Sequence, residues 1–284
     1  MKNMQPIRLV SCDLNGTLVH QHTMMDMIRT GFPHHPDRYE KARDVFTRQT
    51  AGLLSMEETF RIAGPLTQGL SLRKAIEYAL NEMHFLEGFE IFLSAIEEKD
   101  VYFVINSTGY TLTTEVIKIL RGAEKFHDVI CNRLIFGWDG NSEREIEEDA
   151  LSEFVRHYFS HKKENKVYDE ILATGEVELR IRDEKEKARL IFGIAGKADI
   201  PRAAIAHIGD TMGDSRCICE VAKNGGLGIA FNYNKALKDH LEIVLENNEI
   251  SGQIFLSQEK SKTSDLRSLL EVLFPLSSRG SASL

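Results

Sequence analysis

Three short stretches of the sequence place acidic, amide and hydroxyl side chains directly after apolar runs: DLNGT at 13–17, NSTG at 106–109 and GDTMGD at 209–214. Carboxylates at the ends of neighbouring strands are suitable ligands for a hard cation such as Mg²⁺, and a nearby hydroxyl can bind a phosphate oxygen. Each stretch alone is weak evidence, because an Asp after a strand is also a common turn residue. Together they predict a site for a metal ion and a phosphate.

A lysine is expected to bring positive charge to the same site. Lys187 opens the segment KARLIFGIAG, which leads to the third of these stretches. Lys185, in DEKEKAR, is the competing candidate. We expect one of the two to be a solvated surface charge, and we favour Lys187 as the site residue.

The order of apolar and amphipathic segments predicts the elements that position these side chains. Four short continuous apolar runs are typical of strands that are buried on both faces of a parallel sheet: 7–12, 101–105, 204–208 and 227–231. Amphipathic segments such as 110–120 and 186–195 separate these runs. The alternation predicts a doubly wound α/β fold, in which ligands bind beyond the carboxyl ends of the strands.

The stretches together resemble the four motifs of the haloacid dehalogenase superfamily of phosphotransferases, in the branch that contains phosphoserine phosphatases. DLNGTLV resembles the first motif, NSTGY the second and GDTMGD the fourth, and Lys187 stands where the third motif has its lysine. GGLGIAFN is similar to the segment that follows the fourth motif. The resemblance covers residues 5–140 and 173–235, and it implies a Rossmann-like parallel sheet core with a small helical cap domain.

The resemblance also implies a role for each motif residue. Asp13 would be the nucleophile that attacks phosphorus to form an aspartyl-phosphate, and Lys187 would neutralise charge on the nucleophile and the phosphate. The residues implied to bind the phosphate are Asp13, Gly16, Thr17, Ser107, Thr108, Gly109 and Lys187. The residues implied to hold Mg²⁺ are Asp13, Asn15 (through its carbonyl), Asp210 and Asp214.

Two of these roles have alternatives. Asp214 either contacts the metal or supports Asp210 from behind. Ser107 could instead be the N-cap of a helix at 111–121, a position that also favours serine.

The residue two positions after the implied nucleophile departs from the superfamily pattern. Most of these phosphatases have a carboxylate there, which protonates the leaving alkoxide and then activates water, whereas this chain has Asn15. An amide has no proton to exchange near neutral pH, and general acid–base catalysis commonly contributes on the order of 10²–10⁴ in rate. We therefore expect a substrate with a good leaving group, a different general base such as a histidine of the implied cap, or a slow enzyme. Deamidation of the Asn15-Gly16 pair would create Asp.

Four parts are predicted along the chain. Residues 1–19 and 88–256 form the α/β core, and residues 20–87 read as several helices in the position of the superfamily's cap. We call residues 20–87 the helical module. Residues 141–172 form a charged helical insertion within the core, and residues 257–284 form a C-terminal helix at 264–274 and a flexible tail.

Within the helical module, His20, His22 and Arg61 are candidate substrate-binding residues. Phosphoserine phosphatases have a glutamate and an arginine that contact the amino and carboxylate groups of their substrate, and these positions are His22 and Ala63 here. The Asn before the last Asp of the fourth motif is Gly213. These departures argue against free phosphoserine and indicate an acidic or polyhydroxylated substrate.

The composition excludes two classes of partner. The chain of 284 residues has a formal net charge of −8, which argues against nucleic acid and anionic membranes because both attract basic patches. No apolar run approaches about 18 residues, so neither a signal peptide nor a membrane span is expected. The scattered cysteines indicate reduced thiols and a cytoplasmic location: Cys12, Cys131, Cys217 and Cys219.

The sequence therefore predicts a Mg²⁺-dependent phosphatase that acts through an aspartyl-phosphate on a small phosphorylated metabolite. The alternatives are a phosphotransferase and a low-turnover regulatory protein that binds a phosphate ligand. The insertion at 141–172 and the C-terminal helix are candidate surfaces for homo-oligomerisation.

Overall fold

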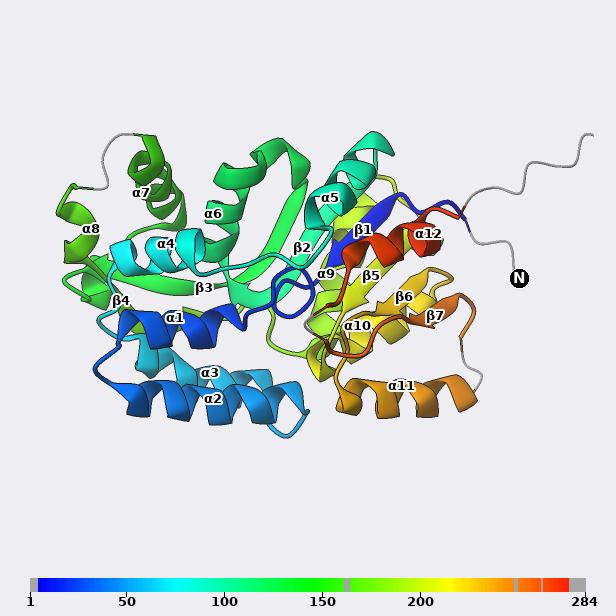
Figure 1. The fold of residues 1–284 in the computed structure, drawn as a ribbon, viewed down its shortest axis with the longest axis horizontal. Coiled ribbons are helices and arrows are strands. Elements are labelled where there is room, and N and C mark those ends of the chain that lie inside the picture. The colour runs from blue at the N-terminus through cyan, green and yellow to red at the C-terminus, as the bar shows by residue number, and fades with distance from the viewer. Residues whose placement is uncertain (1–4, 161–163, 248–249, 262, 276–284) are drawn as a thin grey trace, which may run out of the picture.

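The structure, a computed structural model, describes residues 5–160, 164–247, 250–261 and 263–275. Its centre is a seven-stranded sheet in the order β4-β3-β2-β1-β5-β6-β7 (Figure 1). The strands are β1 (Leu9–Cys12), β2 (Tyr102–Tyr110), β3 (Asp128–Trp138), β4 (Ile171–Glu178), β5 (Ile205–Gly209), β6 (Leu227–Ala230) and β7 (Gln253–Leu256).

Neighbouring strands pair in parallel except for β3 and β4. This confirms the predicted α/β class, and the four apolar runs form β1, β2, β5 and β6. The antiparallel β4 differs from the expected all-parallel sheet. Ile171, which begins β4, pairs with Trp138, which ends β3, so the intervening chain returns to the same end of the sheet and needs no crossover.

Both faces of the sheet are covered by helices, which explains why the apolar runs are continuous. Along β1, Leu9 packs in a cluster with α9 (Glu184–Lys197) and α10 (Met212–Lys223), whereas Val10 packs in a cluster with α5 (Phe89–Glu98) and α12 (Leu270–Leu273). Successive strand residues point to opposite faces, so each face needs its own apolar side chains. The helices of the core are α5 (Phe89–Glu98), α6 (Thr111–Arg121), α9 (Glu184–Lys197), α10 (Met212–Lys223), α11 (Lys235–Glu246) and α12 (Leu270–Leu273).

The helical module contains four α-helices: α1 (Thr23–Gly31), α2 (Pro36–Thr50), α3 (Met56–Ala63) and α4 (Leu72–Asn81). Their buried side chains, Phe46 and Tyr78 among them, belong to one apolar cluster. A capping box starts α3: Glu58 N donates to Ser55 Oγ, and Ser55 N donates to the Glu58 carboxylate. The cap role of this module stays a prediction.

The charged insertion at 141–172 packs against the helical module. It contains α7 (Glu148–Ser160) and α8 (Val167–Glu170). The Tyr158 hydroxyl donates to Glu77 Oε1 of α4 at 3.1 Å, and Arg73 Nε lies 2.8 Å from Asp169 Oδ1. Apolar side chains of α7 share a cluster with those of α4. The apolar face of α7 is therefore covered by the chain itself.

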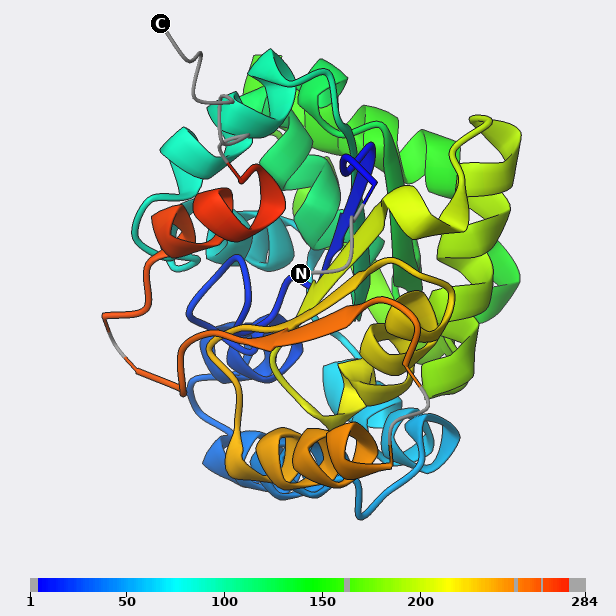
Figure 2. The same cartoon turned by 90° about the vertical axis from the view of Figure 1, so that its right-hand side faces the viewer.

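The C-terminal segment differs from the single helix predicted at 264–274. A 3-10 turn at Leu266–Leu269 precedes the one-turn helix α12. Asp265 Oδ1 caps this turn by accepting a hydrogen bond from Arg267 N. Figure 2 shows the segment running from β7 to α12 past the loop that follows β1. Residues 276–284, the predicted flexible tail, lie outside the described residues.

Within the described parts of the chain, every helix is too short or too polar to cross a bilayer.

Candidate active site

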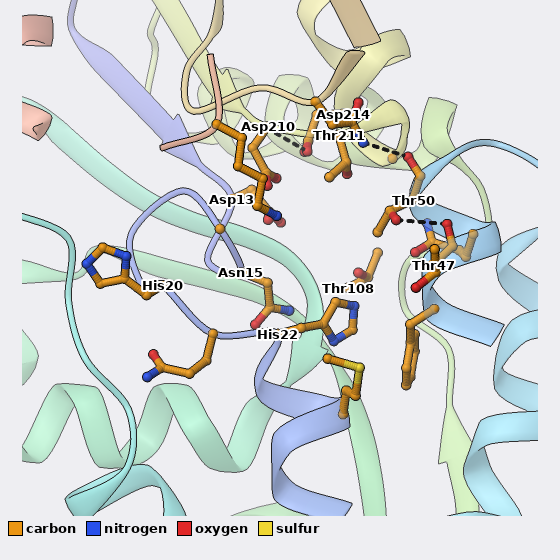
Figure 3. Close-up of a pocket in the computed structure, with 18 of the residues that line it drawn as sticks. Asp13, Asn15, His20, His22, Thr47, Thr50, Thr108, Asp210, Thr211 and Asp214 are labelled. Atoms are coloured by element: carbon orange, nitrogen blue, oxygen red, sulfur yellow. Dashed lines mark hydrogen bonds between the residues drawn. The ribbon is translucent and has the colours of Figure 1, made fainter. Parts of the chain in front are cut away.

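The strand order brings the predicted site residues to one edge of the sheet. β1 lies between β2 and β5, so the order of the strands reverses between β1 and β5. Asp13 directly follows β1 and Asp210 directly follows β5. Both residues border a cavity of about 180 Å³ whose lining comes from the strand ends and from the helical module (Figure 3).

Three aspartates meet at this cavity. One carboxylate oxygen from each of Asp13, Asp210 and Asp214 lies within 4.8 Å of the other two, and all three side chains are buried. Gly16 makes room for this arrangement. Its φ is +76°, and a Cβ at this position would lie 2.1 Å from Asp210 Oδ2, so the cluster requires glycine there.

Lys187 is the cation of this cluster. Its Nζ lies 2.9 Å from Asp13 Oδ1 and 2.6 Å from Asp214 Oδ1, and the residue is 1% exposed. Asp183 Oδ1 caps α9 by accepting a hydrogen bond from Lys185 N, and the Lys185 side chain is exposed. Of the two candidate lysines, the structure therefore places Lys187 at the aspartates and Lys185 at the surface.

The cluster holds more negative than positive charge, and the pKa values reflect the imbalance. Burial raises the pKa of Asp13 to about 6, although Lys187 opposes this shift. Burial, with the Asp13 and Asp214 carboxylates, raises the pKa of Asp210 well above its usual value. Burial alone would also raise the pKa of Asp214, but Lys187 and His207 lower it to about 2.

A row of buried polar side chains lies behind Asp214 and Lys187. His207 Nε2 lies 3.4 Å from Asp214 Oδ1, and His207 Nδ1 lies 3.0 Å from Ser11 Oγ. Asn106 Nδ2 donates to Ser11 Oγ at 3.3 Å and to the main-chain oxygen of Lys187 at 3.1 Å. Ser11 and His207 were not among the predicted site residues, because both stand inside apolar runs that read as core, whereas Asn106 opens the NSTG stretch but was given no role.

Known proteins resemble this chain in sequence and in fold. No family model matches the sequence. Over 232 residues the chain is 25% identical to a curated phosphoserine phosphatase of Archaeoglobus fulgidus, and the match covers 82% of this chain and 54% of the relative. The chain thus spans about half the length of the curated relative that it matches.

Two solved structures have the same fold. A phospho-aspartyl intermediate analogue of phosphoserine phosphatase superposes with a TM-score of 0.66 at 20% identity, covering 95% of this chain and 100% of the other. A haloacid dehalogenase family hydrolase of Salmonella enterica serovar Typhi superposes with a TM-score of 0.65 at 15% identity, covering 98% and 74%. The chain is therefore similar in sequence to a phosphoserine phosphatase and shares its fold with a haloacid dehalogenase family hydrolase.

The three buried aspartates suit a divalent cation. Asp210 Oδ1 has no hydrogen-bond partner within the described residues, although it is buried. Three buried carboxylates face one lysine, and isolated charges of this kind are costly in a protein interior unless they are paired or bind a metal. Oxygen ligands of this type are those that Mg²⁺ prefers. The donor set therefore fits Mg²⁺ on Asp13, Asp210 and Asp214.

Mg²⁺ is expected to stabilise the protein more at pH 7.5 than at pH 5. The folded-state pKa of Asp13 is raised from 3.8 to about 6, so the folded metal-free protein binds more protons than the unfolded chain in this pH range, and its stability falls as the pH rises. A metal removes this penalty and competes with protons for the same oxygens. Differential scanning fluorimetry at a Mg²⁺ concentration of ~100 times its Kd should show a gain of about 2.7 kcal/mol, or about 5 to 10 °C, at pH 7.5.

The matched control for this measurement is Asp210→Asn, which removes one carboxylate and should reduce the Mg²⁺ shift. NaCl at equal ionic strength controls for screening. The metal assignment would be contradicted if NaCl raised the unfolding temperature as much as Mg²⁺ does, or if Mg²⁺ raised it more at pH 5 than at pH 7.5.

Lys187→Met is expected to destabilise the metal-free protein by about 3 to 5 kcal/mol, because it leaves buried carboxylates without their cation. The matched control is Lys185→Met on the exposed side of the same helix, which should change the free energy of unfolding by less than about 0.5 kcal/mol. Urea unfolding in EDTA at pH 7.5 measures both variants. Equal losses for the two lysines would show that the contacts of Lys187 with Asp13 and Asp214 contribute nothing to stability.

Asn15 joins the site to the helical module. Its Oδ1 accepts hydrogen bonds from Thr23 N at 2.9 Å and from Thr23 Oγ1 at 2.7 Å, at the first residue of α1. The residue before α1, His22, makes no capping hydrogen bond with its side chain, so Asn15 supplies one from outside the helix. Because Oδ1 is occupied, a metal contact by Asn15 would use the main-chain carbonyl. The other end of the amide, Nδ2, can donate a hydrogen bond but cannot take up a proton.

Ser107 lies inside β2 and is not the N-cap of α6. The N-cap position is Tyr110, which makes no capping hydrogen bond with its side chain. Ser107 Oγ instead accepts a hydrogen bond from Gly109 N at 3.1 Å, and the Ser107 hydroxyl acts to lower the pKa of Asp13. The cap interpretation is therefore wrong, because the strand continues three residues beyond Ser107.

Not every predicted residue borders the cavity. Gly16 and Thr108 do, but Thr17, Ser107, Gly109 and Arg61 are absent from its described lining. The Thr17 side chain is fully enclosed. On α3 the buried positions are Met56, Thr59, Phe60 and Ala63, which places Arg61 on the exposed side of the helix. The structure therefore does not bring Arg61 to the site.

The helical module lines the side of the cavity that faces the aspartates. Thr47 and Thr50 of α2 border it together with His22 (Figure 3). Burial and the charge of Lys260 lower the pKa of His22 to about 4, so its imidazole is neutral at pH 7. The His20 side chain is exposed at the same cavity. This side therefore presents hydroxyl groups and a neutral ring at neutral pH.

The helical module is closed against the core. Asn234 Nδ2, at the start of α11, donates to the main-chain oxygen of Thr50 at 3.1 Å. A Cβ at Gly213 would lie 3.4 Å from Gln49 Nε2, so the glycine that replaces the motif-four Asn leaves room for a side chain of α2. His22 and Ala63 stand at the positions of the two substrate-binding residues of phosphoserine phosphatases. His22 borders the cavity, whereas Ala63 is buried inside the module and does not border it.

Proposed function

We propose that the protein is a Mg²⁺-dependent cytoplasmic phosphatase that hydrolyses a small phosphorylated metabolite through an aspartyl-phosphate on Asp13. The observation that carries this proposal is the position of Lys187 Nζ, 2.9 Å from Asp13 Oδ1 and 2.6 Å from Asp214 Oδ1, beside a cavity large enough for a phosphate. Four buried free cysteines support a reducing compartment: Cys12, Cys131, Cys217 and Cys219.

The residues of the chain can carry out the transfer in two steps. Lys187 orients the Asp13 carboxylate and keeps it ionised, and a carboxylate oxygen attacks phosphorus while the bond to the leaving oxygen breaks. Water then attacks the phosphorus of the aspartyl-phosphate, which releases inorganic phosphate and restores Asp13. Thr108 borders the same cavity as Asp13 and can donate a hydrogen bond to a phosphate oxygen. Mg²⁺ on the three aspartates would supply further neutralisation of the phosphate charge.

The leaving group must depart without a proton from the residue at position 15. Asn15 Nδ2 can stabilise the leaving oxygen by a hydrogen bond, but it cannot transfer a proton to it. Aryl, enol, acyl and anhydride leaving groups depend least on receiving a proton as they depart. The proposal therefore favours phosphates of this kind over simple alkyl phosphates.

A phosphate-binding protein with little turnover is the second candidate. The observation that favours it is the engagement of Asn15 Oδ1 by Thr23, which holds an amide where catalysis ordinarily uses a carboxylate. A phosphotransferase, in which an acceptor other than water takes the phosphoryl group from Asp13, is compatible with the same residues.

Turnover of p-nitrophenyl phosphate and ethyl phosphate by the full chain, in Mg²⁺ and in EDTA, tests the proposal. We expect Mg²⁺-dependent release of phosphate from the aryl ester and release slower by a factor of about 10² or more from the alkyl ester. Binding of inorganic phosphate without turnover of any ester would favour the second candidate. Faster release in the presence of alcohol acceptors would favour the phosphotransferase.

A further inference from the structure

Lys260 borders the cavity from a segment that none of the four motifs includes. It lies after β7 and before the 3-10 turn at Leu266–Leu269, and its side chain is exposed. It is therefore a cation at the mouth of the site, supplied by neither the helical module nor the strand ends that carry the aspartates.

Main-chain hydrogen bonds fix the chain at Lys260. Lys260 N donates to the main-chain oxygen of Tyr233 at 3.0 Å, and Tyr233 N donates to the main-chain oxygen of Gln258 at 3.0 Å. Two main-chain hydrogen bonds thus join the segment at Tyr233 to the segment at 258–260, beyond the end of β6. The base of the Lys260 side chain is held in place before any ligand binds, which lowers the entropy cost of binding.

Asn232 ties the same segment to the loop that follows β1. Its Oδ1 accepts hydrogen bonds from Ser261 N at 3.0 Å and from Ser264 Oγ at 2.8 Å. Its Nδ2 donates to the main-chain oxygen of Gly16. Because Asn232 is 3% exposed, these bonds are shielded from water. The position of Lys260 is thus coupled to the loop that contains Asp13 and Gly16.

The ammonium group of Lys260 has no carboxylate partner within the described residues. The adjacent Glu259 pairs with Lys238 instead, at 2.8 Å. The charge of Lys260 opposes the rise that burial causes in the pKa of Asp210 on the core side, and it adds to the lowering of the pKa of His22 on the module side. Its field therefore reaches both walls of the cavity.

The rest of the described lining leaves few other groups for a second negative charge. Lys187 is already held by Asp13 and Asp214, and the imidazole of His22 is neutral at pH 7. Apart from the exposed His20, the module side otherwise contributes uncharged groups: Gln21, Met25, Phe46, Thr47, Gln49 and Thr50. A substrate that places an anion at the mouth would meet Lys260.

We propose that Lys260 binds a second anionic group of the substrate, a carboxylate or a second phosphate, while Asp13 and Lys187 engage the phosphoryl group that is transferred. This inference rests on the proposed function and narrows it to phosphorylated acids and bisphosphates. Recognition of the part of the substrate that does not react then comes from the C-terminal segment and not from an arginine of the helical module.

Three ligands with the same two-carbon scaffold test the proposal: ethyl phosphate, 2-phosphoglycolate and ethylene glycol bisphosphate. Their binding is measured by isothermal titration calorimetry with Mg²⁺, in an Asp13→Asn background that prevents turnover. We expect the two ligands with a second anionic group to bind about tenfold or more tightly than ethyl phosphate, as a charge-assisted hydrogen bond provides. Lys260→Met should remove this preference and Lys260→Arg should retain it. Lys197→Met, an exposed lysine at the end of α9, is the matched control.

Three results would overturn the proposal. The first is an equal affinity for all three ligands before Lys260 is changed, and the second is that the preference for the two ligands with a second anionic group survives Lys260→Met. The third is a loss of affinity for ethyl phosphate in Lys260→Met as large as the loss for the other two ligands, which would assign Lys260 to the transferred phosphoryl group. These measurements report binding, so they can contradict the role of Lys260 without contradicting the proposed function. The proposed function fails only if the unmodified chain turns over no phosphate ester in Mg²⁺.

Discussion

Asp13→Asn is expected to lower kcat for p-nitrophenyl phosphate by on the order of 10⁴-fold or more, the scale of loss seen when a catalytic nucleophile is removed. The amide has the shape of the carboxylate but does not attack phosphorus. It also loses the charge that pairs with Lys187 at 2.9 Å. Steady-state release of p-nitrophenol measures the effect, and acid-stable incorporation of phosphate into the protein should disappear with it.

The control for Asp13→Asn is its thermal unfolding. The substitution removes one of three crowded carboxylates, so the metal-free variant should remain folded and unfold at a temperature no lower than the unmodified chain. A folded variant that keeps more than about a tenth of the original kcat would show that Asp13 is not the nucleophile.

Asn15→Asp is expected to raise kcat/KM for ethyl phosphate by about 10² and to change the value for p-nitrophenyl phosphate far less. A carboxylate at position 15 can keep the two hydrogen bonds from Thr23, so one oxygen stays in place and the other occupies the position of Nδ2. This oxygen can protonate the leaving alkoxide, which accounts for the gain. An aryl oxide leaves without such help.

Two controls belong to this experiment. Peptide mass spectrometry of the unmodified chain shows whether Asn15 has deamidated, since a trace of the deamidated chain would imitate slow activity. Asn15→Ala removes the hydrogen bonds to Thr23 and should lower activity on both esters. If Asn15→Asp left the ratio of alkyl to aryl turnover unchanged, the leaving-group argument would be wrong.

Much of the site could be predicted because parallel strands place their carboxyl ends at one edge of the sheet. Asp13 and Asp210 follow strands that pair directly, β1 and β5, so their meeting follows from the apolar runs and the strand order. Lys187 could be ranked above Lys185 by its distance from the fourth motif. The helical phase of α9 then decides the matter, since Lys187 is on its buried side.

Other features depend on packing that no local pattern reveals. Lys260 is a lysine in a polar segment, and its place at the cavity follows from the hydrogen bonds of Asn232. Arg61 was predicted at the site, but the phase of α3 is set by its start at Ser55 and turns the arginine outward. The direction of β4 depends on where the 141–172 insertion returns, which its composition does not encode.

The contact between Asp13 and Lys187 joins residues 174 positions apart in the chain. During synthesis the nucleophile leaves the ribosome long before its lysine does, as chains emerge at roughly 5–20 residues per second. Through that interval Asp13 has neither Lys187 nor Asp210 beside it. The catalytic centre therefore assembles late, when α9 and β5 join the strands already made, so shortened chains that end before position 187 carry the nucleophile without the means to use it.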